Sequence, residues 1–471
     1  MKVITDLQIH SKFSRATSKA NTFPNLAVWA KLKGIDLLAT GDWTHPMWFR
    51  EIERDLEEVG NGLLKLKSGT FKSELQSDYN LKLEGRADPL FLLATEISSI
   101  YTQGGKGRRT HTLVWVPTIA SARKINKEMT KQGCNLLSDG RPIIPLSSIQ
   151  VAELVFNIEP KALVIPAHAW TPWFSMYGSK SGFDSVDEAF GPYAKQIYAV
   201  ETGLSSSPDM NWRIKELDNR KILSFSDAHS GPKLGREATV FDIPDGKLSY
   251  KAIYDAIKNK SKITTNYELS TTNSIAYTIE FHPEEGKYHY TGHRSCDIRY
   301  GPLEVQEKGT GCPVCGKPLT QGVMQRVGEL AGRSIDSLRL TVESMQLVEN
   351  GPEINATSSK AFPNRPSFIS LVPLQEIIAE SIGSPVASNR TKSIYFKLTS
   401  LLASEFDILL KSSVVEIAKI AGERVAEGIE KVRSGDIVVD PGYDGVFGVV
   451  KIWGEGEKKL VDKSKEQLTI F

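Results

Sequence analysis

The sequence predicts an α/β fold whose main unit is a barrel of seven mostly parallel strands. Three observations support this. Short apolar runs alternate with helical stretches up to about residue 265, most of these runs end in a chelating or acidic residue, and the pattern changes beyond about residue 275. The runs expected to be strands are residues 3–7, 35–40, 91–95, 112–116, 162–166, 197–200 and 222–226.

Local signals place one connecting helix and divide the chain. Residues 24–33 should be helical, because Pro24 suits a first helical turn and Gly34 a helix end. A connector rich in Ser, Asn and Pro spans residues 349–366. After it, apolar residues recur at helical spacing and predict helices. Near the C-terminus, the run Asp-Pro-Gly-Tyr-Asp-Gly predicts a β-hairpin. The expected units are a barrel (1–270), a zinc module (271–335), a helical domain with the hairpin (336–455) and a flexible tail (456–471).

The composition is that of an ordinary globular protein and indicates no membrane segment. The 471 residues include 58 Lys and Arg against 56 Asp and Glu, so net charge does not indicate a partner. We find no apolar stretch of the length needed to cross a bilayer and no apolar signal run at the start. Three of the four cysteines cluster as metal ligands do, and we expect a reducing, cytoplasmic location.

Histidines and carboxylates follow strand after strand, which predicts a metal centre at the barrel mouth. One such histidine alone is usually structural, but the repetition favours metal binding, and several carboxylates allow more than one divalent ion, such as Zn²⁺, Mg²⁺ or Mn²⁺. Glu96, His168, Asp227 and His229 are the expected catalytic residues. The expected ligands are Gln8, His10, Asp42, His45, Glu96, His111, His168, Glu201, Asp227 and His229, of which Gln8, Asp42 and His45 carry the weakest signal.

A second metal site is expected in the small module. His293-Arg-Ser-Cys296, fifteen further residues and Cys312-Pro-Val-Cys315 have the spacing of a zinc ribbon in which histidine replaces one cysteine. We expect one structural zinc here. His289 is the alternative fourth ligand, and Cys134, which stands apart, is expected to bind no metal.

Short motifs recur along the chain: Asp6-Leu-Gln-Ile-His10, Gly41-Asp-Trp-Thr-His-Pro46, Ala94-Thr-Glu96, Pro166-Ala-His-Ala-Trp-Thr-Pro-Trp-Phe174, Glu201-Thr-Gly-Leu-Ser-Ser206, Ser226-Asp-Ala-His229, Phe281-His-Pro-Glu-Glu-Gly-Lys-Tyr-His-Tyr290, Cys312-Pro-Val-Cys315 and Pro441-Gly-Tyr-Asp-Gly445. They resemble the motifs of the polymerase and histidinol phosphatase (PHP) superfamily, in the form found in endonuclease Q. The resemblance covers nearly the whole chain, but the superfamily's first motif is His-x-His, whereas this chain has Gln8-Ile-His10. A metal usually held by that first histidine is either absent or held by the Gln8 amide oxygen.

The resemblance implies a DNA-repair endonuclease that binds damaged DNA. Such an enzyme hydrolyses the phosphodiester 5′ to a deaminated base (hypoxanthine, uracil or xanthine) or an abasic site by multi-metal catalysis. The implied fold is a distorted seven-stranded PHP barrel followed by a zinc ribbon and a helical DNA-binding domain. Family members are often described as helicases, but this chain lacks a Gly-x-x-x-x-Gly-Lys-Ser/Thr motif.

Some side chains are candidates for DNA contact. Trp170 and Trp173 follow His168 and would support a flipped base, although packing within the barrel explains them equally well. Four cations near metal-site histidines are candidates for phosphate contact, with a solvated surface as the even alternative. They are Lys12, Arg15, Arg108 and Arg109, the last two in an expected glycine-containing loop.

The last five residues resemble the peptide by which bacterial proteins bind the sliding clamp. In Gln467-Leu-Thr-Ile-Phe471, the side chains expected to enter clamp pockets are Gln467, Leu468, Ile470 and Phe471.

Two other functions compete with the repair nuclease. A phosphatase of the histidinol phosphatase type would use the same metals on a small phosphomonoester, but it needs neither a zinc ribbon nor a clamp peptide. A non-catalytic DNA-binding scaffold would not require so many ligands at one barrel mouth.

Overall fold

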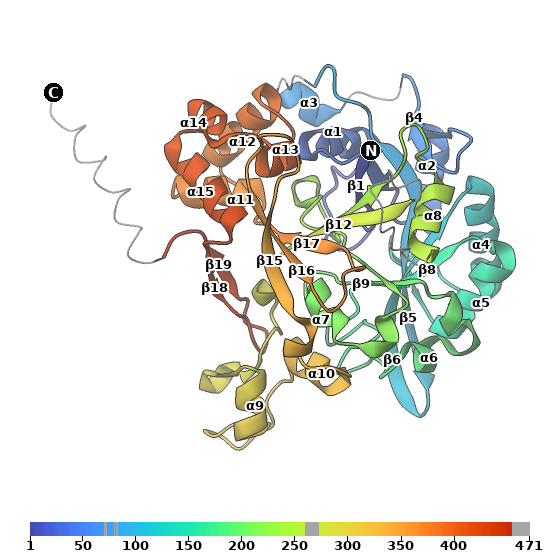
Figure 1. The fold of residues 1–471 in the computed structure, drawn as a ribbon. Helices are drawn as coiled ribbons and strands as arrows, with labels where there is room; N and C mark the ends of the chain where they lie inside the picture. The colour runs from blue at the N-terminus through green and yellow to red at the C-terminus, as the bar shows by residue number, and fades with distance from the viewer. Residues whose placement is uncertain (70–72, 80, 82, 260–272, 455–471) are drawn as a thin grey trace.

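The computed structural model describes residues 1–69, 73–79, 81, 83–259 and 273–454 (Figure 1). A large hydrophobic core extends from Val3 to Trp453, and a small second cluster forms around Tyr300, Cys312 and Leu319. The clamp-like peptide at 467–471 lies outside the described residues. Among the described helices, none is both long and apolar enough to span a membrane.

Strands form at all seven expected runs, but they belong to two sheets. In the large sheet the pairs β1–β2 and β2–β5 are parallel, whereas β5–β6 and β6–β8 are antiparallel. Strands β9 and β10 form a separate parallel pair. The expectation of a mostly parallel arrangement therefore holds for only some of these pairs. The strands are β1 (Lys2–Asp6), β2 (Leu37–Ala39), β5 (Leu90–Gln103), β6 (Lys106–Val116), β8 (Leu163–Pro166), β9 (Ala199–Glu201) and β10 (Lys221–Leu223).

A two-residue turn explains the antiparallel β5–β6 pair. Gly104 and Gly105 have φ angles of +59° and +73°, a conformation that glycine adopts without strain. Gln103 faces Lys106 across the turn, so the two long strands form one hairpin. Arg108 and Arg109 therefore lie on a strand, not in the expected loop.

Backbone contacts beyond the strand ends bring distant segments together. Ile9, after β1, pairs with Ala228, after β10, and the His10 amide donates to the Ala228 carbonyl at 3.0 Å. The Ala169 amide, after β8, donates to the Glu201 carbonyl at the end of β9, also at 3.0 Å. The polar residues after β1, β8, β9 and β10 therefore lie in one region.

The sheet continues across the expected boundary at residue 270. Strand β11 pairs with β1, β12 pairs with both β11 and β17, and β16 joins β17 to the edge strand β15. Strand β16 lies within the segment expected to be a connector. These strands are β11 (Ala238–Asp242), β12 (Ser274–Glu280), β15 (Leu340–Met345), β16 (Ile354–Ser359) and β17 (Ser367–Ser370).

The remaining strands are short, and they include two small hairpins. Strands β13 and β14 form an antiparallel pair in the cysteine-containing module, and β18 and β19 form the late hairpin. The short strands are β3 (Leu56–Glu58), β4 (Leu64–Leu66), β7 (Ile143–Ile144), β13 (Thr291–His293), β14 (Ile298–Tyr300), β18 (Val438–Asp440) and β19 (Val449–Lys451).

Local sequence signals set the ends of many helices. The expected first helix is confirmed: α1 has Pro24 in its first turn, and Gly34 ends it at φ +83° with its amide on the Ala30 carbonyl. Ser147 and Gln150 form a capping box at α5. The helices before residue 335 are α1 (Phe23–Lys33), α2 (Pro46–Asp55), α3 (Glu74–Asp78), α4 (Ile119–Lys131), α5 (Ser148–Ile158), α6 (Val186–Phe190), α7 (Pro208–Trp212), α8 (Tyr250–Lys258), α9 (Pro302–Lys308) and α10 (Val323–Leu330).

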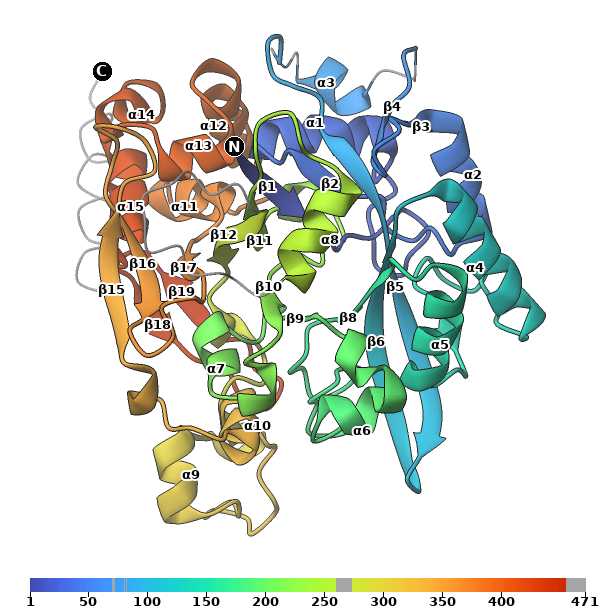
Figure 2. The same ribbon diagram turned by 45° about the vertical axis from the view of Figure 1, so that its right-hand side comes forward.

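Five later helices gather on the side of the sheet away from α4 and α5 (Figure 2). They share the large core with the N-terminal part, and a buried ion pair joins Lys33 of α1 to Glu405 of α13 at 2.6 Å. The later helices are α11 (Leu374–Ser381), α12 (Asn389–Leu401), α13 (Glu405–Leu410), α14 (Val414–Ala421) and α15 (Glu423–Ser434).

Candidate metal centre

Glu96, in the middle of β5, lies between histidines from three other segments. Its Oε2 atom is 3.0 Å from Nε2 of His10, and its Oε1 atom is 3.3 Å from Nε2 of His168 and contacts Nδ1 of His111. The side chain is 1% exposed. One buried carboxylate thus presents its two oxygens to different imidazoles, which is the arrangement of a bridging metal ligand.

The nitrogen and oxygen atoms around Glu96 form two groups with ligand-like spacing. One group is His10, Asp227 and His229, and the other is Glu96, His111 and His168; within each, the potential ligand atoms lie within 4.8 Å of one another. His10 contacts both Asp227 and Glu96 at 3.0 Å, so the groups adjoin. Imidazole with carboxylate suits first-row divalent ions, and two adjoining groups suit two of them.

Gln8 and Glu201 border these groups with unsatisfied oxygens. The Gln8 amide donates to Glu96 Oε2 at 3.1 Å, while Glu201 Oε2 accepts from the His168 amide at 2.7 Å. The other side-chain oxygen of each residue is buried and has no hydrogen-bond partner among the described residues. Because burying a polar atom without a partner is unfavourable, a cation bound here would satisfy both oxygens. The donor set therefore fits a metal.

Asp42 and His45, the weaker expected ligands, lie outside both groups. Asp42 Oδ1 is 3.0 Å from Nδ1 of His10, and its Oδ2 accepts from the Ser11 amide at 2.6 Å and the Ser14 hydroxyl at 2.8 Å. A carboxylate in this position orients the histidine and fixes its tautomer. The His45 ring stacks on Phe13, with ring centroids 4.6 Å apart.

Burial and neighbouring charges shift the pKa values of several groups in the metal centre. Burial, together with the charges of Asp227 and Glu96, raises the pKa of Glu201 well above its usual value. Burial lowers the pKa of His111 to about 4 despite the neighbouring Glu96. Burial alone would raise the pKa of Asp227, but its hydrogen bond and charge interaction with His10 lower it to about 2. Neutral imidazoles and ionised carboxylates are the forms that bind metal.

Three residues of this region have a strained backbone. Asp42, His168 and Asp227 have φ angles of +43°, +28° and +48°. Such angles cost a non-glycine residue on the order of 1–3 kcal/mol and persist where the surrounding structure enforces them, often at functional sites. Next to His168, a Cβ on Gly203 would lie 2.3 Å from the His168 Cβ, so only glycine fits there.

Arg141 also belongs to this region, and no sequence signal identified it. Its Nη1 atom is 3.5 Å from Glu96 Oε2, and its side chain is 24% exposed. A single arginine in a loop has the pattern of a surface residue, and only the fold places it beside Glu96.

The candidate DNA-contacting residues are divided by their burial. Arg108 is buried, stacks on Phe183 and donates to Gly182 and Glu188, and Trp170 is 1% exposed with its Nε1 donating to Asn211 at 2.8 Å. Their expected role in DNA contact therefore disagrees with the structure, because both are enclosed by the protein's own chain. Trp173 is 39% exposed and packs against Tyr288.

The other candidate cations remain at or near the surface. Arg109 is exposed, with its guanidinium 5.7 Å from the Phe174 ring centroid. Arg15 is 77% exposed and lies 3.3 Å from Asp139, while Lys12 is partly buried and lies 2.9 Å from Glu51. These three side chains remain candidates for phosphate contact.

The cysteine-containing module brings four potential ligands together. They are His293, Cys296, Cys312 and Cys315, and Nδ1 of His293 is 3.5 Å from Sγ of Cys315. Partial burial raises the pKa of the Cys312 thiol, but the amides of Cys315 and Val314 and the His293 side chain outweigh it and bring the pKa to about 6. A thiolate is the form that binds zinc. His289, the alternative ligand, is buried outside this group, and Cys134 is buried away from it.

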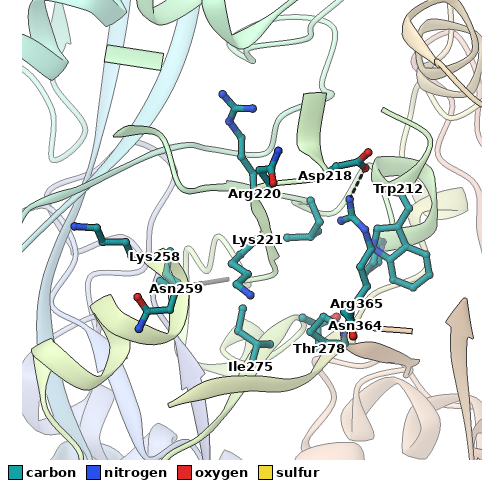
Figure 3. Close-up of a pocket in the computed structure, with 15 residues that line it drawn as sticks. Trp212, Asp218, Arg220, Lys221, Lys258, Asn259, Ile275, Thr278, Asn364 and Arg365 are labelled. Atoms are coloured by element: carbon teal, nitrogen blue, oxygen red, sulfur yellow. Dashed lines mark hydrogen bonds and ion pairs between the residues drawn. The ribbon is translucent and has the colours of Figure 1, made fainter. Parts of the chain in front are cut away.

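A separate cavity of about 190 Å³ lies where β10 begins (Figure 3). Asp227 follows the other end of that strand. The wall of the cavity includes Arg220 and Arg365. Arg220 donates to the carbonyls of Ile197 and Ala194 at 3.1 Å, and Arg365 pairs with Asp218 at 3.1 Å. The protein's own acceptors engage these cations, and the cavity shares no residue with either metal-ligand group.

The fold and this centre define a class, the α/β proteins that gather imidazoles and carboxylates at strand ends to hold divalent metal ions. The chain resembles, over 100% of both chains, the crystal structure of a lesion-specific endonuclease from Pyrococcus furiosus, with 29% identity and a TM-score of 0.74. The chain also resembles a structure of endonuclease Q in complex with a 27-mer duplex that carries an abasic lesion at the active site. The identity is again 29% and the TM-score 0.74, over 97% of this chain and 98% of that one. Along nearly its whole length, this chain is therefore similar to endonuclease Q.

Sequence comparison identifies a further relative. Protein MJ0043 of Methanocaldococcus jannaschii is 29% identical over 308 residues, which are 64% of this chain but 33% of that protein, so the match spans about a third of the relative's length. A family model described as the MJ0043 C-terminal domain matches residues 373–436, which contain the whole of α11 to α15.

Proposed function

We propose that this protein is a metal-dependent DNA-repair endonuclease that cuts the phosphodiester on the 5′ side of an abasic site or a deaminated base. One observation carries the proposal. A chain with two adjoining metal-ligand groups matches, over nearly its whole length, an endonuclease Q bound to duplex DNA with an abasic lesion at its active site. The contacts between Ile9 and Ala228 and between Ala169 and Glu201 support closure of the strands into a PHP barrel around this site.

The histidines are oriented for metal binding by contacts at their far ring nitrogens. His10 faces Asp42 through Nδ1, His111 faces Ser98 through Nε2 at 3.1 Å, and His168 faces Ser175 through Nδ1 at 3.1 Å. In each case the other nitrogen is the one near Glu96. Divalent ions bound here would lower the pKa of a water and stabilise charge on phosphoryl oxygens.

Three cations and one exposed tryptophan support a DNA-binding role. Arg15, Arg109 and Lys12 supply positive charge for phosphates, and Trp173 offers an exposed ring for stacking on a displaced base. Phosphate contacts of this kind position the duplex, while the lesion is selected by the ease with which a damaged nucleotide leaves the helix.

A substrate comparison tests the proposal. The full chain is incubated with Mg²⁺, Mn²⁺ or Zn²⁺ and three labelled duplexes that carry an abasic site, a deoxyinosine or no lesion, with p-nitrophenyl phosphate in parallel. We expect cleavage of the two damaged duplexes alone, abolished by EDTA. Hydrolysis of p-nitrophenyl phosphate without DNA cleavage would indicate the small-molecule phosphatase, and DNA binding without either reaction would indicate a scaffold.

The clamp-like peptide at 467–471 is the basis for a proposed partner, the sliding clamp. Its apolar side chains would each bury surface worth roughly 1.5–3 kcal/mol before ordering costs. Deleting these five residues should abolish clamp binding in calorimetry and leave cleavage of a short duplex unchanged. Equal clamp affinity of the truncated and full-length chains would refute this partner.

A further inference from the structure

We propose that Arg141 binds the phosphate that is hydrolysed and stabilises the charge that develops on it. The inference rests on the proposed endonuclease function and adds a catalytic residue that the metal-ligand pattern does not contain. Arg141 lies between α4 and β7, outside both ligand groups, and its guanidinium reaches Glu96 at their centre.

Hydrogen bonds fix the backbone on both sides of Arg141. The Gly140 amide donates to the Phe13 carbonyl at 3.1 Å, and the Ser98 amide, on β5, donates to the Pro142 carbonyl at 3.1 Å. The Arg141 amide itself donates to Asp139 at 3.1 Å. The loop is therefore attached to the segment after β1 and to the strand that carries Glu96, so Arg141 is held in place relative to the metal centre.

Gly140 allows this loop to approach the centre closely. A Cβ at this position would lie 2.3 Å from both Asp42 Oδ2 and the Ser14 hydroxyl oxygen, and Asp42 is the residue that orients His10. A side chain at position 140 would push the loop away or displace Asp42. The glycine thus brings the Arg141 backbone next to the support of a metal ligand.

The guanidinium of Arg141 keeps donors for a ligand. In the described part of the chain, its side chain makes one ion pair, the 3.5 Å contact with Glu96. A guanidinium has five N–H donors in a planar fork that matches two phosphoryl oxygens, and it remains charged at any working pH. At 24% exposure, the side chain is accessible to a substrate.

The chemistry of hydrolysis explains why a cation is needed here. As the oxygen of water bonds to phosphorus, negative charge grows on the non-bridging oxygens. The bond from phosphorus to the leaving sugar oxygen then breaks, and that oxygen takes up a proton released by the water. A guanidinium already in place stabilises this charge without reorganising, and loss of one such donor typically lowers kcat by about 10²–10³-fold.

Kinetics with two arginine variants test the role. Arg141→Ala should lower kcat on a lesion duplex by about 100-fold, with a smaller change in KM and unchanged metal content. Added guanidinium ion should restore part of the rate. Arg123→Ala is the control, because Arg123 is an exposed arginine of α4 paired with Glu53; its rate should match wild type and not respond to guanidinium. If the wild-type protein cleaves and Arg141→Ala cleaves at the same rate, the role of Arg141 is wrong but the proposed function stands. If the wild-type protein does not cleave, both the proposed function and the role of Arg141 are wrong.

A substrate change separates phosphate contact from an indirect effect through Glu96. A neutral methylphosphonate replaces the phosphate 5′ to a stable abasic analogue, and DNA affinity is measured without turnover. Wild type should lose about tenfold or more in affinity from this replacement, while Arg141→Ala should lose little, because its cationic partner is already gone. Equal losses in both proteins would show that Arg141 does not contact this phosphate and would overturn the proposal.

Discussion

Asp227 combines three features of a residue shaped for chemistry. It has a strained backbone at φ +48°, its carboxylate lies 3.0 Å from His10, and that contact lowers its pKa to about 2. It also shares a ligand group with His229, whose ring packs against that of His10 with centroids 4.6 Å apart. A strained backbone and a shifted pKa are typical of functional sites, so we infer that this carboxylate binds a cation.

The Asp227→Asn variant should therefore lose cleavage of lesion DNA by about 100-fold or more while retaining its fold and most of its DNA affinity. The amide keeps the shape of the side chain but removes the charge that holds a metal. Cleavage rate, circular dichroism and DNA affinity are the measurements. Asp245→Asn, at an exposed residue paired with the N-terminus, is the control. A normal cleavage rate would remove Asp227 from the site.

A second residue-level feature is a pair of buried carboxyls, Glu237 and Glu280, which lies outside the ligand groups. Burial raises the pKa of Glu280 to about 7, and burial with the charges of Glu280 and Glu201 raises that of Glu237 well above its usual value. Ser224 donates to Glu280 at 2.5 Å. Because the folded pKa of Glu280 exceeds the unfolded one, its favourable contribution is complete below about pH 4.5 and is lost as the pH rises to about 7.

Glu280→Gln should remove this pH dependence. At pH 8 the variant should exceed wild type in free energy of unfolding by up to about 3 kcal/mol, with the difference shrinking toward pH 5. Denaturant unfolding between pH 5 and 8 measures it, and Glu343→Gln, on the exposed edge strand β15, is the control. If the difference in free energy of unfolding between wild type and Glu280→Gln does not change with pH, this assignment is wrong.

At the residue scale, chelating side chains could be predicted because they recur after successive strands. His10, His168, Asp227 and His229 are gathered into the two groups, as are Glu96 and His111. Which of these residues bind a metal and which orient a ligand could not be predicted. Whether Asp42 binds a metal or orients His10 depends on which atoms its oxygens face, and the proximity of Arg141 to Glu96 depends on how its loop folds back.

At the element scale, the cysteine module has its own small cluster around Tyr300, Cys312 and Leu319. A core of that size cannot stabilise a fold without a further cross-link, so a zinc ion would supply the missing stability. The four ligands come from β13, the turn after it and the Cys312–Cys315 turn, which the ion would tie together.

Cys312→Ser should lose about one zinc per chain and keep the metals at the Glu96 centre, because the two sites share no residues. His293→Ala should behave alike. Metal analysis by mass spectrometry measures the loss, with Cys134→Ser, at a buried cysteine away from the group, as the matched control. Unchanged zinc in Cys312→Ser would refute the ribbon.

The β5–β6 hairpin shows the limit of prediction at this scale. The two strand cores were predicted from their apolar residues, but strand–helix alternation favoured parallel neighbours. Gly104-Gly105 between them is a two-residue turn signal that outweighs the alternation. Strands β15 and β16 are only partly buried and have no apolar run, so the sequence does not predict them.

At the scale of the whole molecule, the N-terminal and C-terminal parts are joined by one core and a buried ion pair. Lys33 and Glu405 are 2% and 5% exposed and lie 2.6 Å apart, and the Tyr395 hydroxyl donates to Glu405 at 2.8 Å. The sequence predicts separate units with a boundary at residue 270, because the residue pattern changes near there. Pairing of β12 with both β11 and β17 depends on contacts far apart in the chain, which local patterns do not reveal.

Lys33→Met should lower the free energy of unfolding by about 3–5 kcal/mol, because it leaves Glu405 buried without its cation. Lys2→Met, which removes a solvent-exposed pair with Asp242, should cost less than about 1 kcal/mol. Urea unfolding followed by circular dichroism compares them. Similar costs for the two variants would mean that the α1–α13 contact does not join the two parts.

The proposed cutting of DNA beside a lesion by the Glu96 centre can be examined by mapping the cut. A duplex with one abasic site and a 5′ label on the damaged strand is incubated with the wild-type chain and divalent ions, and the product is sized to the nucleotide. We expect one product that ends immediately 5′ to the lesion and that is absent with EDTA and with Asp227→Asn. Cutting of undamaged duplex at the same rate, or no cutting with any of the ions, would contradict it.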